Sequence, residues 1–230
     1  MDDDVSEISV RALARMVRQL FDEDSPQSTL DRIVSAAADE VEGCDGATAL
    51  MVRDRGQLET WASTAPCWQR SDEMQVEVGE GPCFDAIEHR RECFHIPAVG
   101  EDERWPRYAA RARELGIGSA MGFLLFTARD TLGALNLYAE RPRAFPRRSE
   151  NVAWVFASQA AVAFASALND AQLHEALRSR QEIGAAVGIA MERFKIPREQ
   201  AFDALVTLSQ HRNVKLREVA RGIVETGEVS

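Results

Sequence analysis

The side chains best suited to chemistry lie near the end of the chain. Arginine and lysine can pair with phosphate, whereas serine, glutamine and asparagine can hydrogen-bond the edges of unpaired bases. Two of the cations lie where a helix is expected to begin, and free backbone N–H groups at a helix start also favour phosphate. Taken alone, such a set is more typical of a solvated surface than of a binding site. The candidate residues are Arg178, Arg180, Arg193, Ser209, Gln210, Arg212, Asn213, Lys215 and Arg217.

The charge distribution directs any phosphate binding to this C-terminal part. The 230-residue chain has a net charge of −10, which argues against a polyanion as a partner of the whole surface. Residues 173–227 hold nine Lys and Arg against seven Asp and Glu, so their net charge is +2. The rest of the chain therefore carries −12. A net of +2 is weak, so affinity would come from individually placed residues and from dimerisation.

Two cysteines, Cys83 and Cys93, are the candidates for thiol chemistry. Cys83 lies near the start of a short predicted helix, which would lower its pKa and favour the thiolate. We weigh three roles for the pair: packing in the core, redox sensing, and catalysis by a reductase. The four histidines show no metal-binding spacing, so no metal site is predicted, and no cofactor is indicated.

Three C-terminal helices are expected to position the basic residues. Ile183, Ala186, Val187 and Ala190 recur with the period of a helix that ends before Pro197. A second helix follows Pro197, and a third runs from about Lys215 to Gly227. The same periodicity places Phe194 and Phe202 in the core of this unit.

This segment resembles an ANTAR domain over some fifty residues. The resemblance rests on Arg178 to Arg193, on Gln200-Ala201-Phe202-Asp203, and on Ser209 to Ala220. It implies binding to RNA stem-loops in leader transcripts, which prevents termination of transcription. Many ANTAR sequences have lysine directly before the glycine that is Gly188 here, whereas this chain has Val187.

The preceding part reads as an α+β domain with one antiparallel sheet and flanking helices. Period-two stretches from Ala47 to Val52 and from Gln57 to Ser63 predict one hairpin, and Met121–Thr127 with Leu132–Glu140 predicts a second. A helix from Ser28 or Thr29 to Gly43 precedes the first hairpin, and 67–78 shows no clear period.

This part resembles the GAF domains that precede ANTAR modules in actinobacterial regulators. The resemblance rests on Gly79-Glu80-Gly81-Pro82-Cys83, on Trp105-Pro106, on Gly133 to Tyr138 and on Gln159-Ala160-Ala161. It implies signal sensing, with an unknown small-molecule ligand as a candidate. It names neither the ligand nor the direction in which a signal would act.

A long proline-free interval, 147–196, joins the two parts. Its alanine-rich sequence favours one continuous helix, and such a helix could pack against its mate in a homodimer. The expected domains are an N-terminal helix (1–27), a GAF sensor domain (28–168) and an ANTAR domain (169–230), with a linker helix at about 147–180. No run of eighteen apolar residues and no signal peptide are found, so a cytoplasmic protein without a membrane span is expected.

Together these features predict a non-enzymatic, RNA-binding antitermination regulator. Besides a pure protein-interaction module, which would show no salt-dependent binding of nucleic acid, two alternatives belong to other functional classes. The first is a DNA-binding transcriptional repressor. The second is a GAF-fold methionine sulfoxide reductase that uses Cys83 and Cys93.

Overall fold

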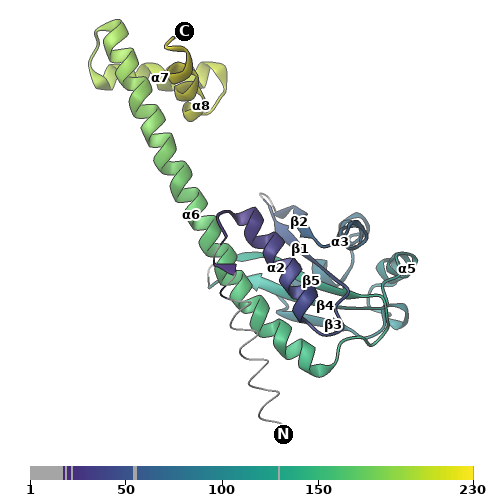
Figure 1. Cartoon of the computed structure of the whole chain (residues 1–230). Coiled ribbons are helices and arrows are strands. Elements are labelled where there is room, and N and C mark those ends of the chain that lie inside the picture. The colour runs from purple at the N-terminus through teal and green to yellow at the C-terminus, as the bar shows by residue number, and fades with distance from the viewer. Residues whose placement is uncertain (1–17, 19, 22, 54–55, 129, 230) are drawn as a thin grey trace. The chain divides into compact units, whose positions relative to one another are not determined.

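The computed structural model describes residues 18, 20–21, 23–53, 56–128 and 130–229. The chain divides into two compact units, Met1–Leu168 and Asn169–Ser230, and each is described by itself (Figure 1). The predicted N-terminal helix, within 1–27, falls mostly outside the described residues.

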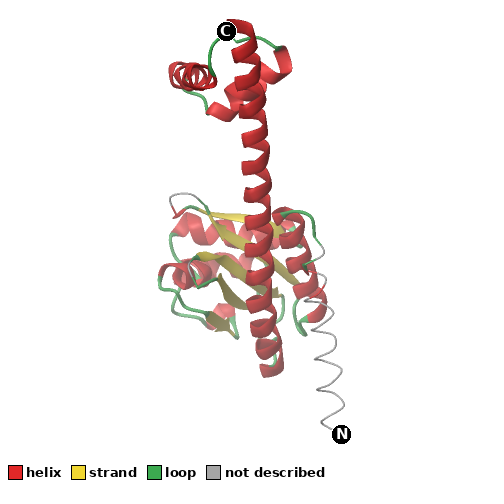
Figure 2. Ribbon diagram, turned by 90° about the vertical axis from the view of Figure 1, so that its left-hand side faces the viewer, coloured by secondary structure: helices red, strands yellow, loops and turns green. Residues whose placement is uncertain are grey.

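The first unit is built on a five-stranded antiparallel sheet in the order β2-β1-β5-β4-β3. The central strands β1, β4 and β5 are buried along nearly their whole length, because helices cover both faces of the sheet (Figure 2). Strands covered on both faces are apolar throughout rather than alternating. The strands are β1 (Gly46–Val52), β2 (Leu58–Ser63), β3 (Cys93–Ile96), β4 (Ser119–Phe126) and β5 (Thr131–Ala139).

Four helices of this unit begin with proline at the first helical position. Proline suits that position because its missing N–H would have no partner there. The helices are α2 (Pro26–Glu40), α3 (Pro66–Val78), α4 (Pro82–Glu88) and α5 (Pro106–Glu114).

Two details of these helices differ from the sequence reading. The N-cap of α2 is Ser25, which forms a reciprocal capping box with Ser28, so the predicted cap at Ser28 or Thr29 is wrong. The stretch from Pro66 to Val78, which shows no clear apolar period, is helix α3. Its inward face carries polar residues, so a search for apolar periodicity passes over it.

The two faces of the sheet have different cores. On one face, α2 and the first part of α6 (Arg147–Phe194) pack with many alanines, among them Ala37, Ala153 and Ala160, around Phe156 and Phe164. Small side chains allow the helix backbones to approach the sheet closely. On the other face, α3, α4 and α5 enclose an aromatic cluster that also contains buried polar groups.

The predicted continuous helix is confirmed, because α6 runs unbroken from Arg147 to Phe194. Among the described residues, α6 is the one helix long and apolar enough, by length and composition, to cross a membrane. Its alanines and phenylalanines between Ala153 and Phe164 are buried against the sheet, so core packing accounts for much of its apolar character.

The second unit consists of three helices. The end of α6 packs against α7 (Arg198–Arg212) and α8 (Leu216–Thr226) around a small core of Ala186, Ala190, Leu205, Ala220 and Ile223. The predicted three-helix unit and the predicted α+β fold class are both confirmed.

One glycine in the sheet is required by a cross-strand neighbour. Gly122 of β4 lies opposite Phe94 of β3, and a Cβ atom at position 122 would lie 1.9 Å from the Phe94 ring. Phe94 is buried, so its ring cannot swing out into solvent without leaving the core. The glycine therefore provides the space in which the aromatic ring covers the strand.

We expect Gly122→Ala to lower the free energy of unfolding of the first unit by about 1–3 kcal/mol, the usual cost of an overpacked core. Phe94→Leu in the same chain should recover part of this loss, because the smaller side chain vacates the contested space. Chemical denaturation of the two single variants and the double variant measures the coupling. Additive effects of the two substitutions would contradict this explanation.

Candidate nucleic-acid interface and buried sensor network

The turn between α7 and α8 brings six of the nine predicted contact residues together. Asn213 adopts the left-handed conformation with φ of 52°, and its N–H donates to the carbonyl of Gln210. Ser209 holds the turn, because its hydroxyl donates to the Val214 carbonyl at 2.6 Å and its own carbonyl accepts from the Val214 N–H. The six are Ser209, Gln210, Arg212, Asn213, Lys215 and Arg217.

The six residues differ in how free their side chains are. Gln210, Asn213 and Lys215 are exposed, and Lys215 is the residue that precedes the first turn of α8. Arg217 forms an ion pair with Glu175 of α6 at 3.3 Å, so part of its charge is already compensated. The hydroxyl of Ser209 is already hydrogen-bonded to the Val214 carbonyl. The exposed amide and ammonium groups are therefore the ones best placed for an external ligand.

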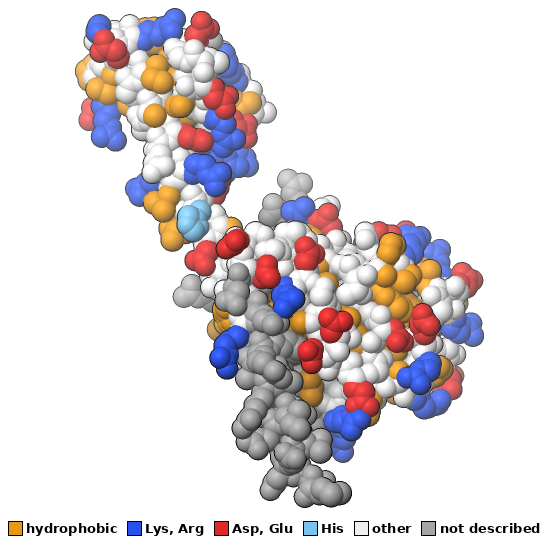
Figure 3. Space-filling model, in the orientation of Figure 1, with side chains coloured by type: hydrophobic (Ala, Val, Ile, Leu, Met, Phe, Trp, Pro, Cys, Tyr) orange, Lys and Arg blue, Asp and Glu red, His pale blue; other side chains and the backbone are white. Residues whose placement is uncertain are grey.

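The three remaining predicted residues lie on α6 and are spread along it. Arg178 is exposed, and Arg180 lies beside α7. Arg193 donates to the carbonyl of Gly227, which follows the last turn of α8. Since α8 has eleven residues, Arg193 lies about 16 Å from the turn that carries Lys215. The nine residues do not form one continuous patch, and Figure 3 shows the basic side chains of this unit interspersed with carboxylates.

Two phenylalanines and Val187 of this unit differ in burial. Phe194 and Phe202 are 48% and 42% exposed, so the prediction that both face the core is wrong. The apolar residues of α7 span more than one face, and the core covers the face that carries Ala201 and Leu205. Val187, which replaces the lysine of many ANTAR sequences, is buried in the core.

The first unit holds a buried polar network that the sequence reading missed. Asp72 of α3 is fully buried. Its carboxylate accepts hydrogen bonds from the Tyr138 hydroxyl at 2.6 Å, from Asn136 Nδ2 at 3.0 Å and from the Thr60 hydroxyl at 2.9 Å. Trp68 stacks on Tyr138 with ring centroids 5.5 Å apart and planes 4° apart. The carboxylate thus ties α3 to strands β2 and β5.

Cys83 belongs to the same network. Its thiol donates to Asn136 Oδ1 at 2.9 Å and accepts from Gln75 Nε2 at 3.1 Å. The backbone N–H of Cys83 donates to Gln75 Oε1 at 2.8 Å, so Gln75 closes a ring of hydrogen bonds with this one residue. Both polar atoms of the Gln75 amide therefore hold the start of α4 against α3, and the bond from Cys83 to Asn136 ties it to strand β5.

Burial governs the protonation of this network. Desolvation raises the pKa of Asp72 from 3.8 to about 6, although its hydrogen bonds favour the charged form. Desolvation also raises the pKa of Cys83 well above that of an ordinary thiol, and the nearby Asp72 carboxylate adds to the effect. The pKa of Cys93 is raised to about 12, chiefly by burial. The expectation that the helix start lowers the Cys83 pKa is therefore wrong.

A recognisable signal for the network does exist in the sequence. Trp68, Ser71, Asp72 and Gln75 are spaced at i, i+3, i+4 and i+7, which is the spacing of one helix face. All four side chains are buried. A helical period carried by polar residues marks a buried hydrogen-bonded face, but an apolar-periodicity search does not detect it.

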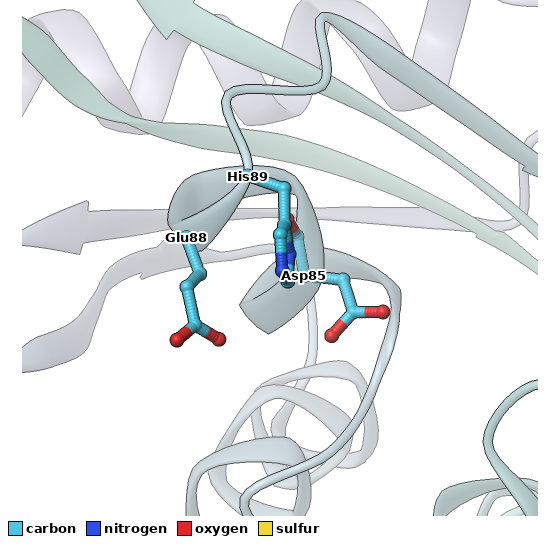
Figure 4. Close-up of side chains that lie close together, drawn as sticks. All are labelled: Asp85, Glu88 and His89. Carbon is cyan, nitrogen blue, oxygen red and sulfur yellow. The ribbon is translucent and has the colours of Figure 1, made fainter.

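Two further features of the first unit are candidate binding sites. A cavity of about 340 Å³ lies between α3 and β2 and is lined by Leu58, Thr60 and Asp72 among others. At the end of α4, the side chains of Asp85, Glu88 and His89 lie close together (Figure 4). Each offers one atom that could bind a metal ion, and these three atoms lie within 4.8 Å of one another. One carboxylate oxygen of Asp85 accepts from Trp105 Nε1 at 2.8 Å, so the structure already uses part of this cluster.

We expect Asp72→Asn to flatten the pH dependence of stability. Since the folded pKa of about 6 exceeds the unfolded value of 3.8, the folded state binds more protons between these values, and stability decreases as the pH rises through this range. Acidification from pH 7 to pH 4 should raise the free energy of unfolding by about 2 kcal/mol more in the native chain than in the variant, because the full effect of the pKa difference is reached only below pH 3.8. Urea denaturation at several pH values measures it, with exposed Asp39→Asn as the control. Parallel curves for the native and Asp72→Asn chains would refute the assignment.

We also expect Cys83 to resist alkylation in the folded protein. Cys67 is exposed, whereas Cys83 is buried, hydrogen-bonded and held as a thiol. Iodoacetamide labelling followed by peptide mass spectrometry should show Cys83 reacting at least about 100-fold more slowly than Cys67, because modification requires local opening. In denaturant both residues should react alike. Rapid modification of Cys83 in the folded chain would contradict this.

Comparison with known proteins supports the two resemblances. A family model of the GAF domain matches residues 23–165, and a model of the ANTAR domain matches residues 171–224. No curated protein matches the chain.

Solved structures resemble the chain in fold. The GAF domain of an Acinetobacter phosphoenolpyruvate-protein phosphotransferase is 19% identical, with a TM-score of 0.55 over 70% of this chain and 95% of that one. The photosensory core module of Stigmatella aurantiaca phytochrome is 13% identical, with a TM-score of 0.60 over 87% of this chain and 44% of that one. Bacteriophytochrome RpBphP3 from R. palustris is 11% identical, with a TM-score of 0.59 over 79% of this chain and 41% of that one. The chain thus spans less than half of each phytochrome chain, and at these identities the likeness shows the fold alone.

GAF domains are signal-sensing domains, and ANTAR domains are RNA-binding antitermination domains; both are regulatory. The GAF match covers more than half of the chain, and the ANTAR match follows it directly. The chain therefore belongs to the GAF domain family and is a GAF and ANTAR domain-containing regulator.

Proposed function

We propose that this protein binds stem-loops in leader transcripts and prevents transcription termination, in response to a signal sensed by its GAF domain. The observation that carries the proposal is the ANTAR match over residues 171–224, which contains the exposed polar turn between α7 and α8. Gln210, Asn213 and Lys215 are the primary contacts, with Arg178, Arg180, Arg212 and Arg217 as phosphate partners. Ser209 and Arg193 act mainly by holding the turn and the end of α8.

The mechanism needs only a modest binding energy. A protein present at 100 times its Kd stabilises the RNA structure that it binds by about 2.7 kcal/mol, which shifts a two-state RNA equilibrium about 100-fold. An antiterminator hairpin that competes with a terminator on nearly equal terms would thus become dominant. A homodimer engaging two hairpins would gain further affinity, because the second contact is intramolecular.

The protein acts as a cytoplasmic, non-enzymatic regulator. The cavity beside Asp72 supports a small-molecule signal, because a ligand there would lie against Thr60, whose hydroxyl bonds the buried carboxylate that connects α3 to strands β2 and β5. A signal can shift the output only as far as its affinities for two states of the protein differ. The raised pKa values of Cys83 and Cys93 count against the sulfoxide reductase and against redox sensing by a thiolate. A DNA-binding repressor remains the competing output function.

We expect Lys215→Ala/Arg217→Ala to weaken binding to a paired-hairpin leader RNA about tenfold or more at 0.1 M salt, and to reduce the salt dependence by about one unit of slope per lost phosphate contact. Lys215→Ala alone should account for most of the loss, because Arg217 is partly neutralised by Glu175. Gel-shift titration of the full chain at two salt concentrations measures both effects.

The control variant is Arg91→Ala/Arg141→Ala, which removes two exposed cations of the first unit and should bind like the native chain. A scrambled RNA and a duplex DNA of matched length complete the set. Binding to duplex DNA alone would favour the repressor and refute antitermination.

A further inference from the structure

The second unit contains a groove whose lining shares one residue, Arg180, with the proposed RNA contacts. It lies between α6 and α7, encloses about 950 Å³, and is lined by Ile183, Gly184, Val187 and Phe202. We call it the α6–α7 groove. A Cβ atom added at Gly184 would meet no neighbour within 4 Å, so this part of α6 is open to close approach. Phe202 is the large apolar side chain exposed in the groove.

The apolar surface continues along α6 beyond the groove. Leu173 and Leu177 are 59% and 49% exposed, and with Gly184 they lie at i, i+4 and i+11, which is one face of the helix. Figure 3 shows exposed apolar side chains on this unit among side chains of both charges. The core of a protein interface is more apolar than the rest of a protein surface and is enriched in aromatic side chains, which Phe202 supplies here.

The charges around the groove are balanced in sign. Arg180, Arg198, Glu199 and Asp203 all line it. Within the described part of the chain, none of the four side chains takes part in an ion pair or a hydrogen bond. Two cations and two carboxylates thus stand at the rim without internal partners.

The four rim charges favour one kind of binding partner for the groove over another. An RNA strand would meet Glu199 and Asp203 as well as the two arginines, and it would gain no net attraction from the rim. A second copy of the groove, related by a two-fold axis, presents the same charges in reverse order. Each arginine can then face a carboxylate of the other copy, as an isologous contact requires. An apolar centre with a self-complementary charged rim therefore fits a second copy of this chain.

We propose that two copies of the chain associate through the α6–α7 groove, with Phe202 at the centre and the four charges paired across the two-fold axis. This inference rests on the homodimer of the proposed function and names the surface that forms it. The groove and the α7–α8 turn involve different residues, and Arg180 of α6 is the one proposed phosphate contact that lines the groove. Association leaves Gln210, Asn213 and Lys215 outside the groove lining.

Charge reversal on full-length protein tests the proposal without RNA. Arg180→Glu/Arg198→Glu makes the groove wholly acidic, and Glu199→Arg/Asp203→Arg makes it wholly basic. Each variant alone should dimerise with a Kd raised about tenfold or more by like-charge repulsion, whereas an equimolar mixture should form heterodimers preferentially. Sedimentation measures the constants, and native mass spectrometry separates heterodimer from homodimers by mass.

Two further variants keep the result interpretable. Arg91→Glu/Arg141→Glu carries the same change in net charge on the exposed surface of the first unit and should dimerise like the native chain. Phe202→Ala leaves all charges in place, and because Phe202 is already 42% exposed the fold should survive while dimerisation weakens. Circular dichroism confirms helix content in each variant.

The outcomes separate this inference from the RNA proposal. A native chain that stays monomeric at every concentration, or a statistical mixture of species from the two charge-reversed variants, would overturn the groove as an interface. The proposal would also be overturned if both charge-reversed variants kept the native oligomeric state while the basic variant gained RNA affinity and the acidic variant lost it. RNA would then be the partner that occupies the groove. If Lys215→Ala/Arg217→Ala loses RNA binding but still forms dimers, the result supports the proposed RNA contacts and leaves the groove as the dimer interface.

Discussion

Helix α6 is the element on which both units depend, because each core buries residues of this one helix. Ala153 to Phe164 close one face of the sheet, and Ala186, Val187 and Ala190 form the centre of the three-helix unit. Without it, α2 would be the main cover of that sheet face, and α7 and α8 would lose the helix that completes their core. The absence of proline between Pro146 and Pro197 allows the helix to serve both cores without interruption.

The two faces of the sheet are packed with different kinds of side chain. The α2 and α6 face is closed by alanine and phenylalanine, which need no hydrogen-bond partners. The opposite face buries a carboxylate, a thiol, two amides and a tyrosine hydroxyl, and each must be satisfied within the protein. Asp72 is the centre of this second arrangement. Burial disfavours the charged form of Asp72, whereas its hydrogen bonds favour that form. A change in either the burial or the hydrogen bonds would therefore change its protonation.

The C-terminal unit separates two kinds of surface. The α7–α8 turn offers polar groups, exposed and partly uncommitted, on a backbone fixed by Ser209 and Asn213. The α6–α7 groove offers an aromatic side chain, aliphatic neighbours and balanced charges. Nucleic acid favours the first chemistry and protein favours the second. A dimer held by the groove would present two turns, which suits an RNA with two hairpins.

The sequence by itself determined the two hairpins, helix α2, the long helix α6, the three C-terminal helices and the two domain families, but not helix α3. Local periodicity, prolines and family motifs carry that information, because secondary structure depends mainly on neighbours in the chain. Only the tertiary structure decided which faces are covered. Periodicity placed Phe202 inward, but α8 covers a different face of α7 and leaves the ring exposed. Helix position suggested a reactive Cys83, but burial and the nearby Asp72 carboxylate of another helix raise its pKa and keep it a thiol. Burial and pKa depend on contacts between residues far apart in sequence, and no local pattern specifies them.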